Sequence, residues 1–132
     1  MKTAKFALAI AALTAAISAS AATNEPNAKG EARLAKMIAG RTAGQPVSCI
    51  PSQLDSQHLQ VIEGTALVYD AGSTIYVARP DDPNSLSSND ILVINRFGSQ
   101  LCKQDVIRTV DRYSGFMTGV VFLGDFVPYK KP

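Results

Sequence analysis

Residues 97–129 read FGSQLCKQDVIRTVDRYSGFMTGVVFLGDFVPY and decide the fold that we predict for this chain. Short runs of β-branched and aromatic residues alternate here with Gly and Ser, which is typical of strands joined by tight turns. Strands are predicted at 106–111 and 116–123, and a compact segment, with one helical turn as an option, at 101–105. Residues 124–125 are expected to break the last strand before a short segment at 126–129.

The segments before residue 97 repeat this pattern. Strands are predicted at 47–50, 58–62, 65–69 and 74–79, a polar turn or one helical turn at 52–57, and a surface loop at 79–89. The connection Glu63-Gly64 suits a hairpin, because glycine accepts the positive φ of such turns. A strand at 90–96 is expected to be central, since the apolar run 91–94 leaves neither face polar. Turn signals about every 8 to 12 residues favour a small antiparallel sandwich or a barrel-like meander.

A short amphipathic helix is predicted before the β-region. Leu34, Met37 and Ile38 recur at helical spacing within residues 28–39, and Gly40 can end the helix. We interpret this stripe as a cover for the core rather than a partner-binding face, on a helix that either leans on the β-region or stays mobile. The predicted organisation is a polar tail and short helix at 23–40, then a single β-domain at 41–132.

Residues 1–22 have the features of a secretory signal peptide. A basic segment at 1–5 precedes an apolar run at 6–17 and the small residues Ala19-Ser20-Ala21. The apolar run is shorter than the roughly 20 residues that a membrane-spanning helix needs. We expect cleavage after Ala21 or Ala22, no transmembrane segment in the mature chain, and a location in the periplasm or outside the cell. An uncleaved anchor or a buried helix is the alternative.

Cleavage would make the chain almost neutral. The sequence has 13 Lys and Arg against 11 Asp and Glu, and losing Lys2 and Lys5 leaves 11 of each sign. Nucleic-acid binding depends on Lys and Arg side chains that neutralise phosphates. No nucleic-acid partner is therefore expected.

Cys49 and Cys102 are the two cysteines of the chain. In an oxidising compartment they allow one intramolecular disulfide, between the first β-strand and the segment before the last pair of strands. Closing a loop of about 54 residues would stabilise the fold by roughly 4 kcal/mol on the chain-entropy model. A buried free thiol or a reactive cysteine are the competing interpretations.

No catalytic set, metal site or cofactor is predicted. His58 is the single histidine, and it cannot complete a Cys-His or zinc arrangement with two paired cysteines. A solvent-exposed strand position explains it. The loop 79–89 is rich in oxygen donors, but after Asp82 it lacks the Gly and the closing Glu of a calcium loop. Turn chemistry is the preferred interpretation of this loop.

Charged residues are grouped near the predicted strand ends. Asp105 and Asp111 would lie about 20 Å apart along one strand, too far to act on one bond, so cross-strand ion pairs are preferred. An exposed aromatic patch would mark a partner surface, although the pattern does not locate one. A possible binding surface is predicted on the polar loop and the edges of the C-terminal hairpin, with these residues: Arg79, Asp81, Asp82, Asn84, Arg96, Asp105 and Arg108.

Several segments resemble a family of small exported proteins of unknown function from Gram-negative bacteria. They are PVSCI at 46–50, TALVY at 65–69, IYV at 75–77, GSQLC at 98–102 and LGDFVPY at 123–129. The resemblance covers nearly all of the chain after Arg41 and leaves out the predicted helix. It implies a periplasmic location and a paired Cys49 and Cys102, and it implies no activity or binding residues.

The leading hypothesis is a non-enzymatic exported β-domain that binds another protein or an envelope component. Near-zero net charge and the lack of a catalytic set favour it. One alternative is an inhibitor of a cell-wall enzyme, which would use the loop 79–89. Another is a small hydrolase that depends on carboxylates such as Asp105 and Asp125.

Overall fold

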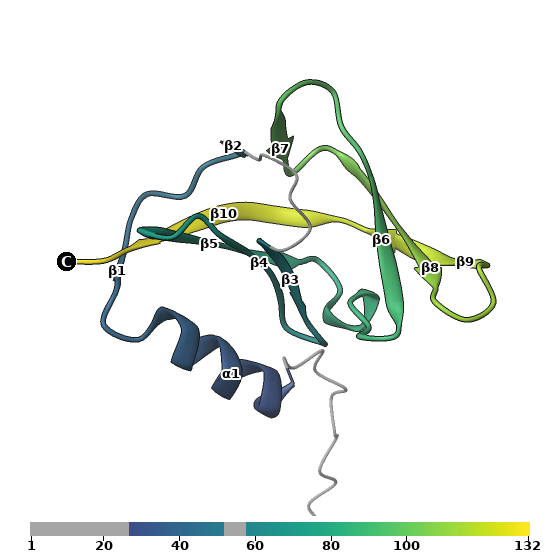
Figure 1. Ribbon diagram of the computed structural model, residues 1–132, viewed down its shortest axis with the longest axis horizontal. Helices are drawn as coiled ribbons and strands as arrows, with labels where there is room; N and C mark the ends of the chain where they lie inside the picture. Colours follow the sequence, from purple (N-terminus) through teal and green to yellow (C-terminus); the bar gives the residue numbers. More distant parts are fainter. Residues whose placement is uncertain (1–26, 52–57) are drawn as a thin grey trace, which may run out of the picture.

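The computed structural model describes residues 27–51 and 58–132, which fold mainly into β-strands (Figure 1). The expected signal peptide and the predicted turn at 52–57 lie outside the described residues. The elements follow one another in this order: α1 (Ala28–Ile38), β1 (Thr42–Ala43), β2 (Cys49–Pro51), β3 (Leu59–Ile62), β4 (Ala66–Asp70), β5 (Thr74–Pro80), the 3-10 helix η1 (Pro83–Ser85), β6 (Asp90–Asn95), β7 (Gln100–Cys102), β8 (Val106–Asp111), β9 (Met117–Val121) and β10 (Leu123–Lys130).

The strands form three antiparallel groups. Their orders are β1-β10-β5-β4-β3, β2-β7 and β6-β8-β9. Phe122 alone separates β9 from β10, and its carbonyl oxygen accepts a hydrogen bond from the backbone N–H of Asp81 at 2.9 Å. The chain therefore passes from one sheet directly into the other. Over the described residues the sheets do not close into a barrel, and the predicted mainly β sandwich with one short helix is confirmed.

Two groups of buried apolar side chains hold the layers together. The larger group lies between the inner faces of the sheets and includes Ile50, Leu101, Ile107, Val121 and Phe126. The smaller group lies under α1, on the other face of the β3-β4-β5 meander. Alternation along β4 feeds both groups, because Leu67 and Tyr69 join the larger one while Ala66 and Val68 join the smaller. The meander is thus covered on both faces.

Helix α1 covers the face of this meander that points away from the larger core. Leu34 is only 3% exposed, and Met37 and Ile38 pack against the smaller group. The side chain of Asn27 accepts a hydrogen bond from the backbone N–H of Lys29 at 3.0 Å and caps the helix. The prediction that the apolar stripe covers the core is confirmed, and the helix leans on the β-region as one of the two expected arrangements.

The prediction of a central strand at 90–96 is wrong. Strand β6 is an edge strand of its sheet, and its burial alternates. Leu92 and Ile94 pack against the larger core, whereas Ile91 and Val93 are 48% and 41% exposed. The apolar run correctly predicts a strand here, but a run of apolar residues cannot show that one face of the strand is exposed to solvent.

The segment at 101–105 does not form the helical turn that was one option for it. Residues 100–102 form β7, whose register with β2 places Cys49 opposite Cys102. A turn follows, in which the carboxylate of Asp105 accepts a hydrogen bond from the Cys102 N–H at 2.8 Å. The predicted disulfide is confirmed between these two cysteines. Pairing with a strand about 50 residues away overrides the local preference.

Three boundaries differ from those predicted. The last long strand breaks at Phe122, while residues 124–125 cause only a register shift inside β10. The β3–β4 hairpin has a three-residue connection, because Ile62 pairs with Ala66. In the segment predicted as a surface loop, β5 continues to Pro80, η1 follows, and Leu86 is buried in the larger core.

Candidate interaction surface

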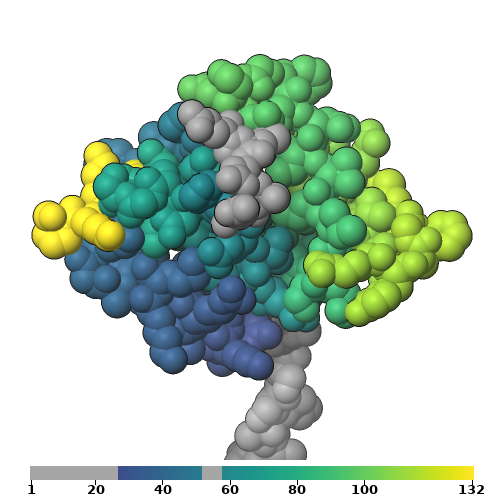
Figure 2. Space-filling view, in the orientation of Figure 1, coloured from purple at the N-terminus to yellow at the C-terminus, as the bar shows by residue number. Residues whose placement is uncertain are grey.

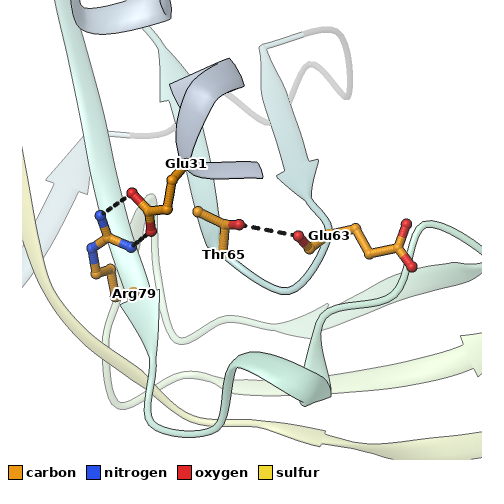
Figure 3. Close-up of polar contacts among 4 residues, drawn as sticks. All are labelled: Glu31, Glu63, Thr65 and Arg79. Carbon is orange, nitrogen blue, oxygen red and sulfur yellow. Dashed lines mark hydrogen bonds and ion pairs between the residues drawn. The ribbon is translucent and has the colours of Figure 1, made fainter. Parts of the chain in front are cut away.

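Arg79, predicted to line a binding surface, fastens helix α1 instead. Its Nη1 and Nη2 atoms donate hydrogen bonds to the two carboxylate oxygens of Glu31 at 2.5 and 3.0 Å (Figure 3). These hydrogen bonds hold the pKa of Glu31 below its usual value, because they favour the ionised carboxylate. The guanidinium of Arg79 is therefore already engaged in a contact between the meander and the helix.

Asp82 and Asn84 lie beside a polar hollow of about 410 Å³ between η1 and β9. The Asp82 carboxylate accepts a hydrogen bond from the Asn84 N–H at 3.0 Å, which confirms turn chemistry at this position. Across the hollow, Thr118 Oγ1 lies 3.0 Å from the Asp90 carboxylate and 2.8 Å from Thr109 Oγ1. The described residues contain no group of three or more His, Cys, Asp or Glu side chains that could hold a metal ion.

The carboxylates of the C-terminal hairpin serve its turns. Asp105 is 7% exposed and closes the β7–β8 turn, while Asp111 accepts a hydrogen bond from the Ser114 N–H at 2.7 Å in the β8–β9 turn. Asp125 lies 2.7 Å from the ammonium of Lys103. The hydrogen bond from Lys103 lowers the pKa of Asp125, so this carboxylate is ionised at neutral pH.

The predicted surface residues therefore do not form one site. Asp81 is exposed at the end of β5, and Arg96 is half-buried just after β6. Among the described residues, Asp125 of the grouped charges pairs with Lys103, which lay outside the predicted group, whereas Asp105 and Asp111 accept hydrogen bonds in turns. The remaining residue, Arg108, lies on a different surface.

That surface is the solvent-facing side of the β6-β8-β9 sheet, which we call the outer face. Strand register sets its side chains in rows across the three strands, with Val93 and Val120 on either side of Arg108. Phe122 follows β9 with its side chain on the same side as that of Val120, because Val121 and Leu123 are buried. The outer face has nine side chains, of which seven are apolar: Ile91, Val93, Asn95, Val106, Arg108, Val110, Met117, Val120 and Phe122.

No described element covers the outer face. Met117 and Phe122 are 59% and 67% exposed, in contrast to Leu34 and its neighbours beneath α1. The β8–β9 hairpin lies on the opposite side of the molecule from α1, as Figures 1 and 2 show in yellow-green and dark blue. Exposed aromatic residues flank the outer face, with Tyr113 and Phe116 in the β8–β9 turn and Phe97 after β6.

The size of the outer face follows from sheet geometry. Three strands about 4.8 Å apart, with three same-side positions about 6.8 Å apart, cover roughly 14 by 20 Å, or about 300 Å². The largest apolar patch on a typical monomer covers about 300–600 Å² and is often functional. The centre of the outer face is charged, because Arg108 lies there with apolar neighbours on both sides.

In the sequence, the signal available for predicting the outer face was the alternation of side chains along residues 106–110. Val106, Arg108 and Val110 share one side of β8, and Ile107 and Thr109 the buried side. The pattern does not show that the Val-Arg-Val side faces solvent, because burial of that side depends on whether another element packs there. The sequence prediction therefore included Arg108 for its charge and left out the apolar residues around it.

The fold and the outer face together define a disulfide-linked, mainly β protein with one uncovered apolar sheet face. Comparison of the chain with protein-family models, curated proteins and solved structures found no match. In the part of the chain that the structure describes, no helix is long and apolar enough to cross a membrane.

Proposed function

We propose that this protein is an exported, non-enzymatic β-domain that binds another protein through the outer face. The observation that carries the proposal is the uncovered apolar side of the β6-β8-β9 sheet. Export is supported by the signal-like residues 1–22 and by the Cys49–Cys102 disulfide, a bond that persists in oxidising compartments. The family resemblance of the Cys-centred segments supports a periplasmic location.

The energetics of the outer face suit a reversible contact. Burying the outer face, about 300 Å² in all and mostly apolar, contributes at most roughly 7 kcal/mol before the cost of association is subtracted. The cost of association offsets most of this free energy, so a partner would also need to contact the flanking aromatic residues. Tyr113 and Phe116 are exposed in the β8–β9 turn, which leads into Met117, and can extend the contact at that end.

The two alternative functions have weaker support. An inhibitory loop at 79–89 would have to enter an enzyme, but Leu86 in this loop is buried in the core. A carboxylate pair of Asp105 and Asp125 would need one free acid, but Asp105 closes a turn and Asp125 is paired with Lys103. Neither arrangement presents a free reactive group.

Capture from a periplasmic extract tests the proposal. The bait is the mature chain, compared with a variant that combines Val93→Lys and Met117→Lys. The control combines Ala32→Lys and Ala35→Lys, which add the same charge on the exposed side of α1. We expect proteins retained by the wild type and the control to be lost from the outer-face variant. Equal retention by both variants would contradict the proposed function.

A further inference from the structure

We infer that the partner binds with a short segment that carries a carboxylate between apolar side chains, and that this carboxylate pairs with Arg108. The inference rests on the proposed function, because it assumes that the outer face is the binding surface. It adds the chemistry of the partner, which the exposed apolar residues alone do not define.

Arg108 is surrounded by apolar side chains. Val93 and Val120 flank it across the sheet, and Val106 and Val110 precede and follow it on the same side of β8. No ion pair or hydrogen bond joins its guanidinium to another described residue. The outer face has no carboxylate of its own.

The two carboxylates at the end of the sheet beside the β8–β9 turn have other partners. Asp90 lies beside Thr118 Oγ1 at 3.0 Å, and Asp111 accepts hydrogen bonds from the backbone of Tyr113 and Ser114. The cation of Arg108 is thus available to an incoming group.

A partner that covers the outer face removes water from this guanidinium. Burial of an unpaired charge is costly, and the cost falls when the charge meets an oppositely charged group with good geometry. A carboxylate can accept two parallel hydrogen bonds from a guanidinium, which is the strongest common arrangement for arginine. An apolar partner with a central Asp or Glu therefore fits better than a purely apolar one.

A second copy of the chain fits less well. Stacking two outer faces about a twofold axis through their centres would bring the two Arg108 side chains together in an apolar contact. The available area of about 300 Å² is also well below the roughly 800 Å² per partner of a stable protein–protein interface.

A lipid surface is also less suitable. Anionic bilayers attract clusters of Lys and Arg, whereas Arg108 is the one charged side chain of the nine on the outer face. A short protein segment matches both the area and the single charge.

Selection from a displayed library of random peptides of about 12 residues, enough to cross the face at about 3.3 Å per residue, tests the inference. The wild-type mature chain is the immobilised target. We expect enriched peptides to carry one Asp or Glu between apolar residues. Changing that residue to Asn or Gln should weaken binding about ten-fold or more, and Arg108→Gln should do the same.

Arg33→Gln is the matched control, because Arg33 is an exposed arginine on α1, outside the outer face. It should leave peptide affinity unchanged. Thermal unfolding of each variant confirms that the compared proteins are folded.

The outcomes separate the inference from the function on which it rests. Peptides without an acidic residue that lose binding with Val93→Lys and Met117→Lys, but not with Arg108→Gln, would overturn the inference and leave the proposed function standing. Peptide binding that survives the Val93 and Met117 changes would contradict both. A dimer in sedimentation that Val93→Lys dissociates, or Arg108-dependent binding to vesicles of anionic phospholipid, would identify a different occupant and overturn the inference.

Discussion

At the scale of single residues, Gly30 sets how closely α1 approaches the sheet. A Cβ atom at this position would lie 1.9 Å from Thr65 Oγ1, the hydroxyl that donates to the Glu63 carbonyl (Figure 3). Gly30→Ala should destabilise the protein by about 1–3 kcal/mol, because the helix must shift. In an exposed helix the same change would stabilise by about 1 kcal/mol. Urea unfolding measures the difference.

The paired control is Lys36→Ala, an exposed helical position where we expect little change. Adding Thr65→Ala to Gly30→Ala should recover part of the loss, because the clashing hydroxyl is then absent. A Gly30→Ala protein as stable as the wild type would contradict the close approach of α1.

Asp105 gives a second prediction at this scale. Its buried carboxylate is the acceptor for the Cys102 N–H. Asp105→Ala should cost about 1–3 kcal/mol of unfolding free energy, because a partly buried donor, the Cys102 N–H, loses its partner. Asp105→Asn keeps an acceptor oxygen and should cost less. Equal costs for the two variants in chemical denaturation would exclude the role of the carboxylate in closing the turn.

At the scale of elements, the ion pair between Glu31 and Arg79 links α1 to β5. The pKa of Glu31 is lowered in the folded state, so its contribution to stability is complete above the unfolded value of about 4.3. The contribution is lost as pH falls through the lower folded pKa. The two side chains are 36% and 51% exposed, which limits the contribution to roughly 0.2–1 kcal/mol.

A double-mutant cycle of Glu31→Gln and Arg79→Gln measures this coupling against pH. We expect a coupling energy of up to about 1 kcal/mol near pH 7 and almost none near pH 3. Coupling of the same size at both pH values would show that the carboxylate charge is not its source.

Local patterns predicted the elements whose surroundings are also local. The stripe of α1 and the strands of the β3-β4-β5 meander match their predicted positions within a few residues, and Gly64 takes the positive φ expected for the hairpin connection. Strands β6 and β7 differ from what was predicted, because the position of each in the fold depends on segments that are distant in sequence. β7 pairs with β2, and β6 remains at an edge.

The candidate surface was predictable to a smaller extent. Charge pointed to Arg108, and turn chemistry explained Asp82, but the exposed side of an apolar strand looks the same in sequence as a buried one. Ile91 and Val93 illustrate this, since residues 91–94 have uniform hydropathy and only alternate ones are partly buried. The sequence does not show whether another element packs on this face, and among the described residues none does.

At the scale of the whole molecule, the disulfide joins the short strands β2 and β7, of three residues each. Replacing both Cys49 and Cys102 by Ser should lower the stability by roughly 4 kcal/mol and Tm by about 10 °C or more. Differential scanning calorimetry measures the change. A shift of only about 1–2 °C would mean that the core holds the fold without this bond.

The covered and uncovered sheet faces divide the molecule into a structural side and the side through which we propose that it binds a partner, here called the binding side. Helix α1 completes the structural side, and the outer face forms the binding side. Side-chain changes at exposed positions on the binding side should therefore affect partner binding more than stability.

Site-specific photocrosslinking in intact cells tests this division most directly. A photoreactive residue replaces Val93 on the outer face in one protein and Ala35 on α1 in another. We predict that irradiation yields a discrete adduct with another protein from position 93 and none from position 35. An adduct from position 35 with none from position 93 would contradict the assignment of the outer face as the binding surface.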